Sequence, residues 1–173
     1  MKKSRNLAAA LAVAGLALSA PAHAQYGRTV SNDISKCHRG SGPAILVTVD
    51  GIESSRGRMR VQAYHATAAD WLSSGRWLTR VESPAKAGTM QFCLPVSAAG
   101  SYGIAVRHDV NGNGKTDLSE DGGAMSNNPS INIFNLGKPS YRKVAFSAGP
   151  GVTSIRVRTV SYTHLTLPTN YSV

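Results

Sequence analysis

The chain has 173 residues, of which 19 are lysine or arginine and 9 are aspartate or glutamate, so its formal charge is +10. Its 42% hydrophobic content is ordinary for one globular domain, and its 16% charged content is too low for a coiled coil or a strongly charged disordered chain. The composition also excludes collagen. Abundant loop-forming residues favour β structure, and the excess of base raises the question of an anionic partner.

The first 24 residues have the three parts of an export signal. Two lysines and an arginine within the first five residues precede an apolar run over 7–20 and a small-residue cleavage site that ends at Ala24. A membrane anchor, the alternative, needs about 20 apolar residues, and this run is shorter. No cysteine stands at the cleavage point, which argues against a lipoprotein. We predict cleavage near Ala24 and a periplasmic or secreted protein with no transmembrane span.

Residues 25–43 and 44–159 are expected to form an N-terminal arm and a single domain. The arm is rich in glycine, serine, asparagine and arginine, and we expect it to be tethered to the domain. The domain contains short runs of alternating apolar and polar residues, bounded by glycine, proline and serine, which is typical of antiparallel strands with one buried face. These runs are centred on 45–49, 59–63, 92–94, 102–108, 144–146 and 155–158. We predict an all-β fold, a single antiparallel β-sandwich of about seven strands, with one short helix near 68–73.

The last part of the chain, 160–173, is predicted to be a non-native tail. From Val160 to Thr169 it resembles the translation of a sequencing-library adapter over ten unbroken residues. A genuine final strand is the alternative, since Val160, Tyr162 and Thr163 favour β structure. We therefore assign no function to residues from about Val160 onward.

Two cysteines, Cys37 and Cys93, remain after the predicted cleavage. In an exported chain a disulfide is the default, and it would tie the arm to the strand around 92–94. Closing so long a loop is worth about 4 kcal/mol in the chain-entropy model. Two unpaired thiols are the alternative. The chain has no C-x-x-C motif, which argues against a redox catalyst.

Residues 109–120 match the calcium-loop pattern D-x-[DN]-x-[DN]-G-x5-E. Oxygen-bearing side chains stand at alternate positions, Gly114 permits a sharp turn, and the final glutamate can bind through both oxygens. Hard oxygen ligands of this kind favour Ca²⁺ over zinc or copper. The candidate metal ligands are Asp109, Asn111, Asn113, the backbone carbonyl of Lys115, Asp117 and Glu120.

A metal-free loop built on Asn-Gly turns is the alternative interpretation of this segment. It explains the two Asn-Gly pairs but not the acidic residues at the first, ninth and twelfth positions. Four of the nine acidic residues of the chain lie within 109–121, which carries a net charge of −3 in an otherwise basic protein. A strand is predicted before Asp109, and Thr116 stands where an aliphatic residue is usual. We therefore expect a single loop of weak affinity, about 10⁻⁴–10⁻³ M, and not a paired EF-hand.

Several short motifs, taken in their order along the chain, resemble a known family. They are Trp71-Leu72, Pro84-Ala85, Leu94-Pro95, the run from Tyr102 through His108-Asp109 to Asp117, and Ser126-Asn127-Asn128-Pro129. Over about residues 44–159 the chain is similar to small exported bacterial proteins of the family called domain of unknown function 2141. The resemblance implies an immunoglobulin-like or prealbumin-like all-β domain, and it brings no established activity.

The other candidates for chemistry are scattered along the chain. His38, His65 and His108 lack the spacing of zinc ligands, and we expect His108 to be half-exposed at a strand end. The chain has no G-x-S-x-G, H-E-x-x-H or phosphate-binding loop. The sequence therefore gives no catalytic residues, although a sandwich can assemble them from distant loops, so the question of an enzyme stays open.

Aromatic and basic side chains offer two further interpretations. Trp71, Trp77 and Tyr64 could form a platform for a sugar or a peptide, but packing is the commoner role of such rings. Arginines alternate along 56–60 and 156–158, where they could meet an anionic envelope polymer or form solvated strand faces. Nucleic-acid binding would need a known motif or interleaved aromatic residues as well, so we expect no nucleic-acid partner.

These observations predict an exported cell-envelope protein, a monomeric binding or structural module with a Ca²⁺-organised loop. Its partner would be an envelope component, either a glycan or a protein. The alternative is a metal-free envelope module that binds carbohydrate or peptide. A hydrolase of unknown type is the third interpretation.

Overall fold

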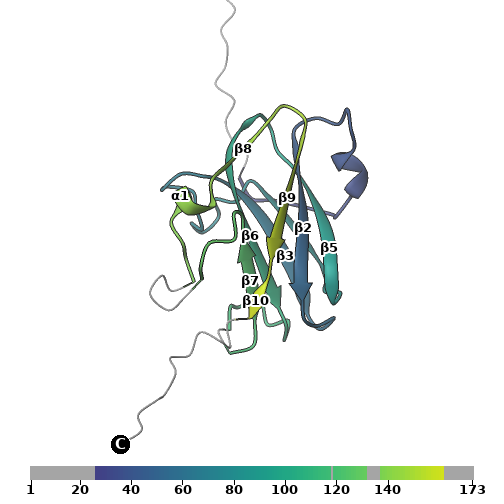
Figure 1. The fold of residues 1–173 in the computed structure, drawn as a ribbon, viewed down its shortest axis with the longest axis vertical. Helices are drawn as coiled ribbons and strands as arrows, with labels where there is room; N and C mark the ends of the chain where they lie inside the picture. Colours follow the sequence, from purple (N-terminus) through teal and green to yellow (C-terminus); the bar gives the residue numbers. More distant parts are fainter. Residues whose placement is uncertain (1–25, 118, 132–136, 162–173) are drawn as a thin grey trace, which may run out of the picture.

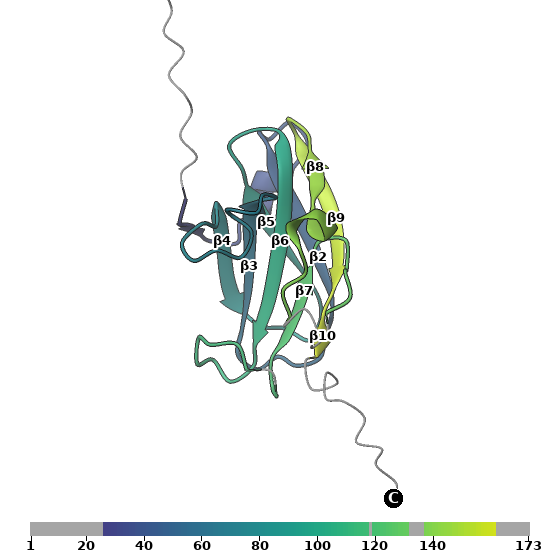
Figure 2. The same cartoon turned by 90° about the vertical axis from the view of Figure 1, so that its left-hand side faces the viewer.

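The computed structural model describes residues 26–117, 119–131 and 137–161, which form two β-sheets packed one on the other (Figures 1 and 2). The predicted export signal, 1–24, and most of the predicted tail, 162–173, lie outside the described residues. The described part of the chain is almost entirely strand and loop, so the predicted all-β sandwich is confirmed.

The larger sheet has the strand order β1-β4-β3-β6-β7-β10, and β8 pairs with the first residues of β6. Its strands are β1 (Arg28–Val30), β3 (Arg58–His65), β4 (Thr79–Pro84), β6 (Gly100–Asp109), β7 (Gly122–Met125), β8 (Phe146–Ala148) and β10 (Val160–Ser161). The strands β3 and β6 lie at its centre and form its longest ladder, from Arg58 opposite Asp109 to His65 opposite Tyr102.

The smaller sheet has the order β5-β2-β9, formed by β5 (Gly88–Pro95), β2 (Ala44–Ile52) and β9 (Val152–Arg158). Within the described residues the pairings are antiparallel except for β1 with β4 and β2 with β9, which are parallel. In both parallel pairs the chain crosses to the other sheet between the two strands, and such a crossover is what parallel pairing requires.

Alternation along the strands places one face of each sheet in a common core. In β2, Ile45, Val47 and Val49 are fully buried, whereas the residues between them are partly exposed. Removing these apolar side chains from water is the main force that holds the two sheets together. The core includes Ile45, Val47, Phe92, Leu94 and Val157 from the smaller sheet and Met59, Val61, Val81, Ile104 and Val106 from the larger one.

Some elements differ from the sequence prediction. The described chain has ten strands against about seven predicted, and three of them, β1, β8 and β10, have only two or three residues. The helix predicted near 68–73 is wrong. One α-helical hydrogen bond, of the i to i−4 type, forms there, from the N–H of Trp71 to the carbonyl of Thr67 (3.0 Å), and Leu72 then leaves the helical region at φ 55°. A single-turn helix instead occurs at α1 (Tyr141–Val144).

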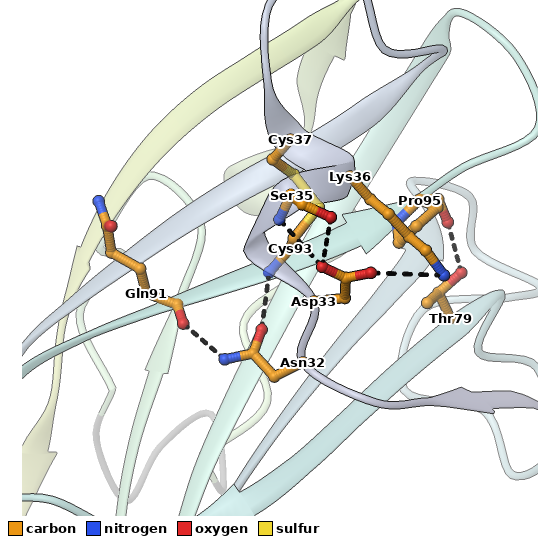
Figure 3. Close-up of a disulfide and its surroundings, with 9 residues drawn as sticks. All are labelled: Asn32, Asp33, Ser35, Lys36, Cys37, Thr79, Gln91, Cys93 and Pro95. Carbon is orange, nitrogen blue, oxygen red and sulfur yellow. Dashed lines mark hydrogen bonds and ion pairs between the residues drawn. A yellow bond between two sulfur atoms is a disulfide. The ribbon is translucent and has the colours of Figure 1, made fainter.

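The N-terminal arm is attached to the smaller sheet by a disulfide between Cys37 and Cys93, whose Cα atoms lie 5.8 Å apart (Figure 3). Cys37 ends a short 3-10 helix, η1 (Ile34–Cys37). Asn32 accepts from the N–H of Cys93 (3.1 Å) and donates to the carbonyl of Gln91 (2.8 Å), so it pairs with β5, an edge strand. The predicted disulfide is therefore present, and it closes a loop of 56 residues.

The three residues that follow β7, Ser126–Asn128, form a polar corner of the fold. Its first residue, Ser126, connects β6 to α1 through hydrogen bonds. The Ser126 hydroxyl is buried, accepts from the N–H of Ile104 (3.0 Å) and donates to the carbonyl of Val144 (2.6 Å). A short side chain thus satisfies one donor and one acceptor that would otherwise be buried without partners.

The two asparagines of this corner extend the connection to the smaller sheet. Asn127 donates to the carbonyls of Lys143 (3.2 Å) and Ala145 (2.9 Å), and Asn128 accepts from the N–H of Arg158 in β9 (2.8 Å). Both asparagines have a positive φ, 63° and 45°, which asparagine tolerates better than most residues. The Ser-Asn-Asn corner therefore has a structural role in the fold.

At the C-terminal end, Val160 and Ser161 pair with Gly123 and Gly122 of β7. The adapter origin of residues from Val160 onward stays a prediction. Among the helices of the described residues, none is long and apolar enough to cross a membrane.

Candidate functional site

The predicted calcium loop connects β6 to β7 at one end of the larger sheet. Asp109 is the last residue of β6, so a strand precedes the loop, as the sequence predicts. Gly112 and Gly114 adopt φ angles of 74° and 78°, in the left-handed region that glycine enters without steric cost. Gly114 is the sixth residue of the pattern, where a calcium loop needs its sharp turn.

The base of the loop is fixed by two buried carboxylates. The oxygens of Asp121 accept from the N–H groups of Val110 (3.0 Å) and Asp117 (2.9 Å), and Oδ2 of Asp109 accepts from the N–H of Gly114 (2.8 Å). Asp121 is fully buried. Asp121 lies outside the predicted ligand set, although its position directly before the buried strand β7 is a signal for a structural carboxylate.

The outer part of the loop brings together four of the predicted ligands. The side-chain NH₂ of Asn111 donates to Asp117 (2.9 Å) and to Glu120 (3.0 Å), and that of Asn113 donates to the same Oδ2 of Asp117 (2.6 Å). These hydrogen bonds, from Asn111 first and then Asn113, lower the pKa of Asp117 below its ordinary value. Two amides and two carboxylates thus converge.

The amide oxygens of the two asparagines face the backbone. Oδ1 of Asn111 accepts from the N–H of residue 113 (3.1 Å), and Oδ1 of Asn113 accepts from the N–H of Lys115 (2.7 Å). Within the described residues, no group of three or more histidine, cysteine, aspartate or glutamate side chains could hold a metal ion. In this geometry, amide-to-carboxylate hydrogen bonds connect the outer loop side chains.

One oxygen at the base of the loop has no partner. The Asp109 side chain is 6% exposed, and its Oδ1 makes no hydrogen bond to the described residues. The nearest cation is Arg107, whose Nη2 lies 3.6 Å from the other oxygen, Oδ2. A buried carboxylate oxygen without a donor is unfavourable, and each such atom in a native fold requires an explanation.

Arg107 connects the loop to the outer face of the larger sheet. Its guanidinium donates to the carbonyl of Gly114 (3.0 Å) and the hydroxyl of Thr116 (3.3 Å). Thr116, the unusual eighth residue of the pattern, therefore makes a polar contact instead of an apolar one. Burial, followed by the proximity of Arg60, lowers the pKa of Arg107.

The β2–β3 loop packs against the start of the acidic loop. Gly57 has a φ of 71°, and a Cβ atom there would overlap the carbonyl oxygen of Asp109. The preceding residue, Arg56, has its carbonyl 2.9 Å from Nε2 of His108. Only glycine fits at position 57, because both its backbone conformation and its close approach to Asp109 exclude a side chain.

The histidines occupy separate environments. His108 is 4% exposed, so the prediction that it is half-exposed is wrong. The reason is that position 108 points to the inner face of β6, along with Val106. His65 stacks on Tyr102 with ring centroids 5.5 Å apart, and His38 is exposed in the arm.

The two tryptophans make packing contacts. Nε1 of Trp71 donates to the carbonyl of Pro139 (2.8 Å), its ring meets Tyr64 edge-on at 5.5 Å, and a Cβ atom on Gly103 would lie 2.8 Å from the indole. Trp77 lies under the guanidinium of Arg80 at 3.7 Å. These contacts favour the packing interpretation of the aromatic residues over a sugar platform.

Comparison with known proteins identifies the family. The family described as "Uncharacterized protein conserved in bacteria (DUF2141)" matches residues 47–156. The chain belongs to this family, and the resemblance seen in its motifs is confirmed. No curated protein matches the chain. No solved structure matches it either.

Proposed function

We propose that the protein is an exported cell-envelope module, of the binding or structural kind, whose acidic loop (residues 109–121) is organised by Ca²⁺. Export is supported by the signal-like pattern of residues 1–24 and by the disulfide, because disulfides persist in oxidising compartments.

The unpartnered Oδ1 of Asp109 carries the calcium part of the proposal. It belongs to the first residue of the calcium-loop pattern, and the side chains at the third, fifth, ninth and twelfth positions of the same pattern already converge. A cation would give that oxygen a partner, and it would offset the net −3 charge of the loop.

The oxygen-bearing residues of the loop are of the types that Ca²⁺ takes as ligands. Asp109, Asp117 and Glu120 would bind through carboxylate oxygens, Lys115 through its carbonyl, and Asn111 and Asn113 through amide oxygens once their amides turn. When bound, the ion would supply the positive charge around which these oxygens gather. The NH₂ groups of the two asparagines partly fill that role by donating to Asp117 and Glu120.

Thermal unfolding with and without calcium tests the proposal. At about 100 times the dissociation constant, Ca²⁺ should stabilise the fold by about 2.7 kcal/mol, or about 10 °C in Tm for a domain of this size. A sodium chloride sample of equal ionic strength controls for screening.

Two carboxylate variants make the test specific. Glu120→Gln, an exposed change at the twelfth position, should remove most of the calcium-dependent increase in Tm, and Glu53→Gln, an exposed change outside the loop, should retain it. A parent Tm that does not move up to millimolar Ca²⁺ would contradict the proposal, as would an increase that Glu120→Gln retains in full.

A further inference from the structure

A cavity of about 460 Å³ lies on the outer face of the larger sheet, away from the core. Two arginines on neighbouring strands, Arg60 on β3 and Arg107 on β6, line it together with polar and apolar side chains. The polar ones include Gln62, Thr116 and Lys138. Its volume is in the range of small-molecule sites.

The two arginines stand directly opposite each other in the β3–β6 ladder. Like charges in that position destabilise a sheet, and both side chains are largely buried, at 24% and 17% exposed. Two opposed arginines reduce the stability of the sheet, and such local costs are typical of functional sites, where the side chains serve binding instead of stability.

The charged side chains among the described residues that line the cavity are all basic. Arg60, Arg107 and Lys138 line it, and none of its described lining residues is acidic. The arginines contact carboxylates behind the lining: Arg60 pairs with Glu82 (2.6 Å), and Arg107 lies 3.6 Å from Asp109. The cavity therefore presents positive charge to a ligand.

A third arginine nearby is already occupied. Arg80 stacks on Trp77, and its guanidinium donates to the side-chain oxygen of Gln62 (2.9 and 3.2 Å) when the Gln62 amide is turned so that its oxygen faces these donors. Nε of Arg60 donates to Glu82, and the terminal nitrogens of the Arg60 guanidinium make no hydrogen bond to the described residues. Among the described residues, the terminal nitrogens of Arg60 are therefore available to a ligand, and the buried Nε of Arg107 also makes no hydrogen bond.

We propose that this cavity binds a small sugar that carries a carboxylate or phosphate group. Arginine forks match the geometry of both oxyanions, and Lys138 adds a third positive charge at the rim. The Gln62 amide and the Thr116 hydroxyl would bond sugar hydroxyls, and Leu72 and Met125 would contact the apolar face of the ring. This inference names a ligand for the binding module and does not rest on calcium.

Titration of the mature protein with three sugars tests the inference. The probes are glucuronate, glucose 6-phosphate and neutral glucose, followed by calorimetry at low salt. The buffer is freed of calcium on a chelating resin, because dissolved chelators are themselves polycarboxylates. Saturable binding is expected for at least one anionic sugar, at least tenfold tighter than for glucose, and the tighter of the two identifies the anion. Repetition with Ca²⁺ separates this result from the loop proposal.

Three variants locate the site. Arg60→Gln should weaken binding about tenfold or more, as expected when a charged hydrogen-bond donor is lost. Lys138→Gln, an exposed change, should weaken it severalfold and preserves a test if Arg60→Gln does not fold. Arg39→Gln, an exposed change in the N-terminal arm, should leave affinity unchanged. The inference is overturned if neither anionic sugar binds, if glucose binds equally well, or if folded Lys138→Gln and Arg60→Gln bind like the parent.

Discussion

Two asparagine-rich segments of this protein use the same side chain in opposite ways. In the Ser-Asn-Asn corner, Ser126–Asn128, the side chains bond backbone groups of distant elements, 16 to 30 residues away in sequence for the two asparagines. In the acidic loop, the hydrogen bonds that Asn111 and Asn113 make to described residues all stay within the loop, two to nine residues away, and their NH₂ groups face carboxylates.

The comparison separates a structural segment from a candidate binding segment. The Ser-Asn-Asn corner acts as a clamp between elements of the fold, and the acidic loop is the candidate binding site. The corner's hydrogen bonds connect β6, α1 and β9, so breaking them should loosen the fold. The loop's outer hydrogen bonds are exposed and replaceable, so breaking them should cost little stability and should change what the loop can bind.

The base of the acidic loop should be the part most sensitive to substitution. Gly57→Ala places a methyl group against the carbonyl of Asp109 at a positive φ, and we expect a loss of about 3 kcal/mol or more in the free energy of unfolding. Gly75→Ala is the matched control: its φ is 72°, but nothing lies near its Cβ. It should lose about 1 kcal/mol. If urea unfolding gave equal losses of stability for Gly57→Ala and Gly75→Ala, the close approach of Gly57 to Asp109 would not be the cause.

The clamp is tested next by Ser126→Ala. This change leaves the N–H of Ile104 and the carbonyl of Val144 buried without a partner, so we expect a loss of about 2–3 kcal/mol, measured by urea unfolding. Ser97→Ala, at an exposed position where the described residues offer its hydroxyl no hydrogen bond, should lose less than about 0.5 kcal/mol. A Ser126→Ala protein as stable as the parent would contradict the stabilising role of the Ser-Asn-Asn corner.

The direct comparison replaces one asparagine from each segment. Asn127→Ala loses two hydrogen bonds and places alanine at a φ of 63°, so a loss of about 2 kcal/mol is expected, and Asn127→Gly separates the backbone part. Asn111→Ala should lose less than about 0.5 kcal/mol in calcium-free buffer. If Asn111→Ala were the more damaging change, the two segments would have the opposite roles.

The smallest effect is expected for Asp50, a carboxylate on β2 in the smaller sheet. A hydrogen bond from Thr89, followed by the interaction with Arg156, outweighs desolvation and lowers its pKa, joining β2 to both of its neighbours. Its contribution is therefore complete above the pKa of the unfolded chain and is lost as the pH falls through the lower folded pKa. In unfolding measurements between about pH 5 and pH 2, Asp50→Asn should show a shallower loss of stability than the parent. Identical pH profiles would contradict this.

The strands with regular alternation could be predicted from the sequence, because one buried face imposes a period of two. Ile45, Val47 and Val49 show this plainly, and all are buried. Strand β7 could not be predicted in this way, since Gly122–Met125 is buried on both faces and has no alternation. The predicted helix near 68–73 failed because tertiary packing of Trp71 over Gly103 takes precedence over local propensity.

Of the two candidate sites, only the acidic loop could be predicted, because its residues lie close together in the sequence. The calcium-loop pattern placed Asn111, Asn113, Asp117 and Glu120 together, and the structure brings them together. The arginine-lined cavity was not predictable, because Arg60 and Arg107 become neighbours only through the register of β3 and β6, which the sequence does not state.

The central proposal is that the acidic loop binds Ca²⁺, whereas the side chains of the Ser-Asn-Asn corner serve the fold. Side-chain amide signals of asparagine, followed by two-dimensional NMR during a calcium titration, test it most directly. Binding of Ca²⁺ by the amide oxygens must turn the NH₂ groups of Asn111 and Asn113 away from Asp117. The account predicts large, saturable shifts for these two amides and none for Asn127 and Asn128. Signals of Asn111 and Asn113 that stay in place up to millimolar Ca²⁺, or that move no more than those of the corner, would contradict it.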